Sequence, residues 1–109
     1  MPNLFEDLPS DLSKEVIEIL AQGKNIRIER IVSFGQSSPD GFWYEQDQAE
    51  WVIVLQGEAK LLLEGDQEPI HMAAGDHLTI PANQKHRVEW TMPDATTIWL
   101  AVFFSDADR

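Results

Sequence analysis

From Asn25 onward, the chain repeats a pattern that leaves few folds open to it. Apolar residues alternate with a period of two in short runs separated by Gly, Pro, Asp and Asn; the runs are 25–34, 50–56, 59–64, 69–73, 76–80, 86–91 and 97–104. Many short strands joined by turns are typical of a sandwich or barrel. At 109 residues and 43% hydrophobic content, the chain can fill one core but not two. We therefore expect an all-β domain over residues 25–109.

The first 24 residues show a different spacing. Apolar residues recur there at intervals of three and four, which would place them on one stripe of a helix. These residues are Leu12, Val16, Ile19 and Leu20. Pro9 suits the start of a helix and Gly23 suits its end. The pattern predicts an N-terminal segment, residues 1–24, with a short amphipathic helix over 8–23 packed on the outside of the barrel.

Charge and cysteine content exclude several partners. Eight Lys and Arg stand against nineteen Asp and Glu, giving a net charge of −11, which repels nucleic acid and anionic lipid. No apolar run reaches the ~18 residues of a membrane span, and the acidic start lacks the basic region of a secretory signal. Without cysteine, a metal would need His, carboxylate or amide ligands. We expect a cytoplasmic protein that binds neither nucleic acid nor membrane.

Two segments carry a recognisable spacing. In EWVIVLQG, Glu50 precedes Gly57, and in GDHLTIPANQKH, Gly75 is followed by Pro81 and His86. This spacing resembles the two motifs of the cupin family, over about residues 26–104. The resemblance implies a double-stranded β-helix, also called a jelly-roll barrel. Asn83 stands where the second motif has a turn glycine, and Asn tolerates a left-handed backbone better than most residues.

The first motif departs from the family pattern at its pair of histidines, where this chain has Tyr44 and Gln46, or Trp43 and Glu45 if the gap to Glu50 is one residue longer. In cupins these histidines, the glutamate and the second-motif histidine bind one divalent metal. The resemblance implies that His86 and Glu50 are retained ligands, with Gln46 next, for Mn, Fe, Ni or Zn. The alternative is a metal-free pocket in which Glu50 and His86 are hydrogen-bonded. Glu50 and Tyr44 are the candidates for proton transfer.

Further candidates come from strand alternation. Arg30 falls on the apolar face of its strand, where it would pair with Glu50 or Glu89, turn outward at a bulge, or bind a substrate anion. Trp90 shares a face with His86, so Trp43, Tyr44 and Trp90 could wall a pocket mouth. We therefore expect a small-molecule ligand.

Apolar residues also occupy the faces that alternation places outside the barrel. The outer set comprises Trp51, Ile53, Leu55 and Trp99. A contiguous exposed apolar patch is unusual on a monomer, so we expect a homodimer formed through sheet faces or an exchanged N-terminal segment.

Two functions fit these features. The first is a small metal-binding cupin that binds or acts on a small organic molecule, an organic acid included, with oxygenase, isomerase or lyase chemistry. The second is a non-catalytic, metal-free module that binds a metabolite or acts as a sensor. The fold alone does not decide between them.

Overall fold

The computed structural model describes residues 1–105, and these contain strands but no helix. The strands are β1 (Val16–Gln22), β2 (Ile26–Ser33), β3 (Ala49–Gln56), β4 (Glu58–Leu63), β5 (Ile70–Ala73), β6 (His77–Ile80), β7 (His86–Thr91) and β8 (Thr97–Phe104). β2 to β8 follow the period-two runs of the sequence closely. Within the described residues, no helix could span a membrane.

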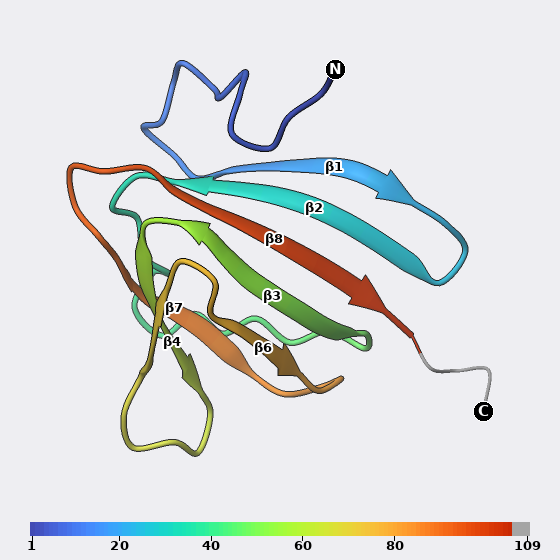
Figure 1. Ribbon diagram of the computed structural model, residues 1–109. Helices are drawn as coiled ribbons and strands as arrows, with labels where there is room; N and C mark the ends of the chain where they lie inside the picture. Colours follow the sequence, from blue (N-terminus) through green and yellow to red (C-terminus); the bar gives the residue numbers. More distant parts are fainter. Residues whose placement is uncertain (106–109) are drawn as a thin grey trace.

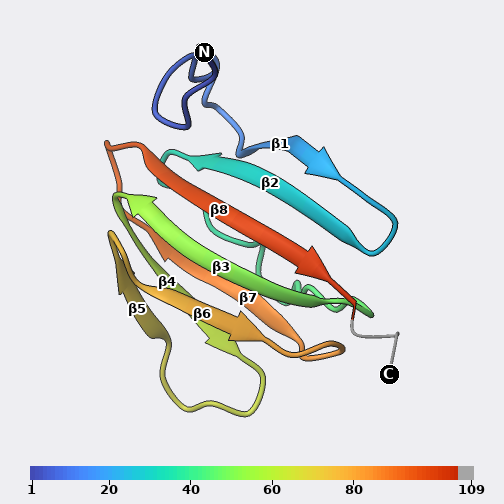
Figure 2. The ribbon, with the colours of Figure 1, turned by 45° about the vertical axis from the view of Figure 1, so that its right-hand side comes forward.

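The strands form two antiparallel sheets that face each other (Figures 1 and 2). The larger sheet has the order β1-β2-β8-β3-β6, and the smaller has the order β5-β4-β7. The chain crosses between the sheets at the β3–β4 turn, around Gly57. This confirms the predicted all-β barrel.

The segment before β3 completes the smaller sheet. The amide of Tyr44 donates to the carbonyl of His86 at 2.8 Å, and the amide of His86 donates back at 3.0 Å. Two residues further along β7, the carbonyl of Val88 accepts a hydrogen bond from the amide of Ser38 at 2.8 Å. Residues 38–44 therefore run beside β7 and place Tyr44 next to His86.

Apolar side chains of both sheets fill the space between them. Val52 and Val54 from β3 and Trp99 from β8 meet Ala59 and Leu61 from β4. All five are buried. Trp99 was predicted on the outer face, but it points inward. Alternation could not decide its direction because both faces of β8 are apolar.

The predicted N-terminal helix is wrong: Val16–Gln22 is strand β1, and residues before it form no helix. Val16, Ile17 and Ile19 are β-branched, which favours extended backbone over helix. β2 offers an unpaired edge, and β1 pairs with it from Val16↔Val32 to Gln22↔Arg27. The turn that joins them closes with the amide of Gly23 donating to the carbonyl of Ile26 at 2.8 Å.

Candidate functional site

A cavity of about 240 Å³ lies between the two sheets. Its lining residues are Glu15, Ile17, Arg27, Glu29, Ile31, Tyr44, Gln46, Glu50, Val52, Leu61, Ile80, His86, Val88, Trp99 and Phe103. More than half of these are apolar or aromatic. An apolar cavity with a few polar groups is the usual form of a small-molecule site.

Three of the residues singled out in the sequence converge inside the cavity. The imidazole Nε2 of His86, from β7, lies 3.3 Å from Glu50 Oε1, from β3. The Gln46 amide donates to the same oxygen at 3.1 Å. Glu50 and His86 are both buried, at 7% and 5% exposure. The two cupin motifs therefore bring their surviving residues together, as their spacing predicts.

The hydrogen bond of His86 Nδ1 determines which ring nitrogen can exchange a proton in the cavity. Nδ1 lies 3.0 Å from the carbonyl oxygen of Gln84, which can only accept a hydrogen bond. Nδ1 therefore carries a hydrogen, and Nε2 is the atom that gains or loses a proton in the cavity. Burial alone would lower the pKa of His86, but hydrogen bonds to Glu50 and to the Gln84 carbonyl, with the Glu50 charge, raise that pKa above its usual value.

Tyr44 covers the histidine. Its ring stacks on the His86 imidazole with centroids 5.7 Å apart and an interplanar angle of 24°. Burial and the charges of Glu15 and Glu50 raise the pKa of the Tyr44 hydroxyl. The hydroxyl therefore stays protonated, and it can donate a hydrogen bond to a bound molecule.

A second polar group lies on the β1–β2 side of the cavity. Arg27 donates from Nε to Glu29 Oε2 at 2.7 Å, and its guanidinium lies over the ring of Phe103. Glu15, just before β1, accepts a hydrogen bond from the Ser33 hydroxyl at 3.0 Å. Sequence reasoning missed these residues. The signal was present, because Arg27, Glu29 and Ile31 alternate onto one face of β2.

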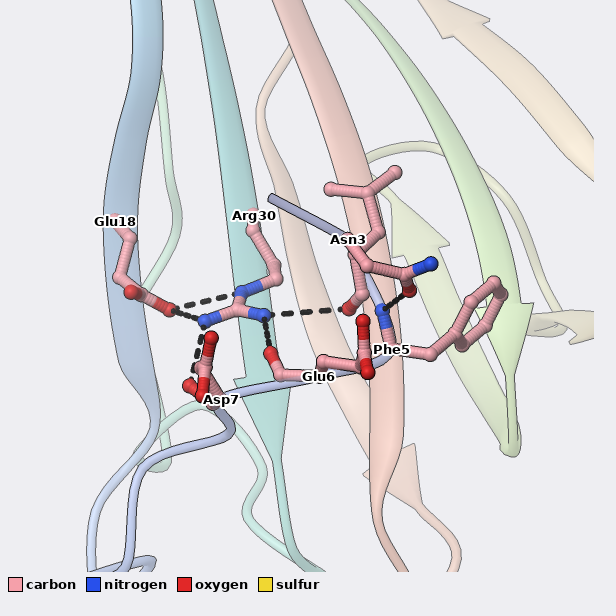
Figure 3. Close-up of polar contacts among 7 residues, drawn as sticks. Asn3, Phe5, Glu6, Asp7, Glu18 and Arg30 are labelled. Atoms are coloured by element: carbon pink, nitrogen blue, oxygen red, sulfur yellow. Dashed lines mark hydrogen bonds and ion pairs between the residues drawn. The ribbon is translucent and has the colours of Figure 1, made fainter. Parts of the chain in front are cut away.

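Arg30 lies on the opposite face of β2 from Arg27 and does not line the cavity. Figure 3 shows its guanidinium between Glu18 and Glu6. Its Nη2 donates to Glu18 Oε1 at 2.6 Å, and Nη1 and Nη2 also donate to the carbonyls of Leu4, Glu6 and Asp7. Neither predicted partner, Glu50 nor Glu89, is involved. The guanidinium thus joins residues 4–7 to the outer face of the sheet, and the alternative that it binds a substrate in the cavity does not fit this position.

Trp90 and Trp43 also lie outside the cavity lining. A bulge in the β4–β7 pairing explains the position of Trp90. Leu61 pairs with Val88, but the preceding residue of β4, Lys60, pairs with Trp90, so Glu89 is the extra residue. The bulge inserts one residue and turns Trp90 to the outer face, where the Lys60 ammonium lies 5.3 Å from the ring centroid. Of the three aromatic residues expected to wall the pocket, only Tyr44 therefore lines the cavity.

Arg87 holds the segment that carries Tyr44. Its guanidinium is buried and donates to the carbonyls of Ser38 at 3.1 Å, Pro39 at 3.2 Å and Phe42 at 3.5 Å. Sequence analysis did not identify this role. The available signal was an arginine directly after His86 in the second motif.

The turns of the two motifs agree with their spacing. Asn83 adopts a φ of 67°, which confirms its role in place of the turn glycine. A sequence profile of the cupin domain family matches residues 31–103. The chain belongs to the cupin family.

Solved structures show how closely this cupin follows others. A protein from Ralstonia eutropha JMP134, named as a candidate mannose-6-phosphate isomerase, superimposes with a TM-score of 0.93 at 46% identity, covering 96% of this chain and 97% of that one. A cupin with a double-stranded β-helix fold from Methanocaldococcus jannaschii has a TM-score of 0.71 at 24% identity, covering 90% and 86%. No curated protein matches the chain.

The donor set of this cupin suits a loosely held metal ion better than a tightly held one. Within residues 1–105, no three His, Cys, Asp or Glu side chains converge on one point. His86 and Glu50 are two strong donors, and the Gln46 amide is a weak one whose nitrogen faces Glu50. The Nδ1 contact of His86 with a backbone carbonyl is, however, the arrangement that metal-binding histidines commonly have.

Proposed function

We propose that this cupin binds a small organic molecule in the barrel cavity, and that His86 can exchange a proton with it. What supports the proposal is a single arrangement: an apolar cavity whose polar side chains Gln46, Glu50 and His86 gather at one end. Because a cavity of about 150 Å³ holds benzene, one of about 240 Å³ suits a molecule of about ten heavy atoms.

The buried pair defines the chemistry. With its proton on Nε2, His86 donates toward Glu50 or toward a bound oxygen, and without that proton the same atom is a base. Glu50 offsets the charge of the protonated ring, so the pair needs no ion for charge balance. Tyr44 adds a hydroxyl donor beside it.

A cavity-filling variant tests the proposal. In protein treated with a chelator, ligand-observed NMR with a set of fragments of up to about ten heavy atoms should find binders. Ile31→Trp, which fills the cavity, should abolish their binding, and Ile53→Trp, on the outer face of β3, should retain it. Fragments that bind both variants equally, or no binding to the wild type, would overturn the proposal.

The second candidate is a metal-dependent cupin, which the carbonyl contact of His86 Nδ1 favours. His86 Nε2, the Glu50 carboxylate and the Gln46 amide oxygen, after rotation of the amide, would hold the ion. Such an ion would polarise a substrate oxygen. After dialysis against Mn, Fe, Ni or Zn salts, elemental analysis should show metal in the wild type and in His71→Ala but not in His86→Ala. Equal metal in both variants would contradict this candidate.

The name of the Ralstonia protein suggests a third activity, phosphosugar isomerisation. The cavity gives that activity little support here. Arg27 is the one Lys or Arg among the described residues that line it, and it is already paired with Glu29. A phosphate group would need a free cationic partner.

A further inference from the structure

The charges inside the cavity do not balance. Its acidic and basic side chains are Glu15, Arg27, Glu29, Glu50 and His86. Glu29 pairs with Arg27 at 2.7 Å, and Glu50 lies 3.3 Å from His86. Glu15 accepts a hydrogen bond from a serine hydroxyl, and within residues 1–105 no salt bridge joins it to a cationic side chain. One carboxylate therefore remains without a counter-charge.

We propose that the cavity selects a small organic monocation, such as an ammonium on an apolar body, and that Glu15 is its counter-charge. This inference rests on the proposed function, because it names the class of molecule that the same cavity takes. The apolar body would lie against the aliphatic and aromatic walls, and the charged end would reach the β1 side.

The setting of Glu15 supports this role. Burial raises its pKa, with the Ser33 hydrogen bond acting in the opposite direction. The charged form is therefore costly while no Lys, Arg or His of residues 1–105 forms an ion pair with it. A bound cation would reduce that cost. The Ser33 hydroxyl also accepts a hydrogen bond from the Trp99 indole at 3.2 Å, which holds the serine in place beside Glu15. Glu15 lies just before β1, outside the stretch 31–103 that the family profile matches.

The cavity already holds one organic cation, the side chain of Arg27. Its guanidinium carbon lies 4.3 Å from the centroid of the Phe103 ring, while its Nε donates to Glu29. A carboxylate on one side and an aromatic face on the other is a common way to hold an organic cation. Tyr44 and Trp99 are further aromatic side chains that line the cavity.

An anion would meet the opposite conditions. Glu15 and Glu50 would repel it, Arg27 is paired, and the whole chain carries a net charge of −11. Arg30, which the sequence suggested as a possible partner of a substrate anion, lies on the other face of the sheet. These charges therefore disfavour an organic acid, which the sequence analysis included among the ligands of the cavity.

Three molecules with the same branched five-carbon skeleton test the inference: isopentylamine, isopentanol and isovalerate, which differ in charge at one end. Titration calorimetry at neutral pH should find the amine bound about tenfold or more tighter than the alcohol, a ratio that a modest ion pair supplies, and the carboxylate weakest. Glu15→Gln should bring the amine close to the alcohol. Glu68→Gln removes the same charge from an exposed position and should leave the ratio unchanged.

The outcomes separate the two proposals. If the alcohol or the carboxylate binds the wild type as tightly as the amine, the cationic class is wrong while the cavity remains a binding site. If the amine preference survives in Glu15→Gln, folded by circular dichroism, the assigned counter-charge is wrong. If none of the three binds, the cationic inference fails, and the fragment screen decides separately whether the cavity binds any small molecule.

Discussion

Gly57, at the crossing from β3 to β4, offers a sharp test of how the barrel is closed. Its φ is +87°, and a Cβ placed on it would lie 2.8 Å from Thr97 Cα and 2.9 Å from the Thr96 carbonyl oxygen. Both neighbours are backbone atoms, so neither can swing away. In Gly57→Ala, the left-handed backbone should cost about 1–2 kcal/mol, and the overlap should cost about 1–3 kcal/mol more. We expect the free energy of unfolding to fall by about 2–5 kcal/mol in total.

A matched control isolates the overlap. Gly65 has a φ of +99°, and a Cβ there would have nothing within 4 Å. Gly65→Ala should therefore cost only the backbone contribution, about 1–2 kcal/mol. Urea unfolding followed by circular dichroism measures both variants. If Gly57→Ala costs no more than Gly65→Ala, the close approach of the β3–β4 turn to the start of β8 is not what requires glycine.

Three further predictions concern the buried pair, the N-terminal segment and association. The pKa of His86 is raised in the folded protein, so protonation stabilises the fold at pH values below the ordinary pKa of 6.5, and this gain is lost as the pH rises through the pKa of the folded state. The free energy of unfolding should therefore differ more between wild type and Glu50→Gln at pH 6 than at pH 9. Equal differences in urea unfolding at the two pH values would contradict the pairing of His86 with Glu50. Arg30→Met should speed hydrogen exchange at the amides of residues 4–7 and leave the exchange rates of β3 unchanged. Unchanged rates at residues 4–7 would show that Arg30 does not hold this segment on the sheet. The homodimer stays a prediction: sedimentation velocity at micromolar concentration should show twice the chain mass, and a monomer would exclude it.

The strands from β2 to β8 could be predicted because turn residues punctuate them and the period of two is regular. The inward direction of Glu50 and His86 followed from the same alternation and from the motif spacing. These are local properties, and side chains of one strand obey them without knowledge of the rest of the chain.

The misplaced residues depended on pairing that no single segment encodes. β1 is extended because β2 offers it a free edge, although its apolar spacing also fits a helix. Trp90 changes face at a bulge that the hydrophobic pattern does not show. Trp99 lies on a strand with apolar residues on both faces, and Arg30 lies on a strand whose more apolar face turns away from the cavity. Alternation therefore told which side chains share a face but not which face is inside.

Methyl NMR tests the central claim, that the barrel cavity is the binding site, most directly. The protein would be labelled at Ile, Leu and Val methyl groups and titrated with whichever of isopentylamine, isopentanol and isovalerate binds most tightly. We predict that the methyl signals of Val52, Leu61 and Ile80, inside the cavity, shift with increasing probe, while those of Ile53 on the outer face do not. Shifts confined to Ile53 and its outer neighbours, with the cavity methyl groups unmoved, would contradict the account.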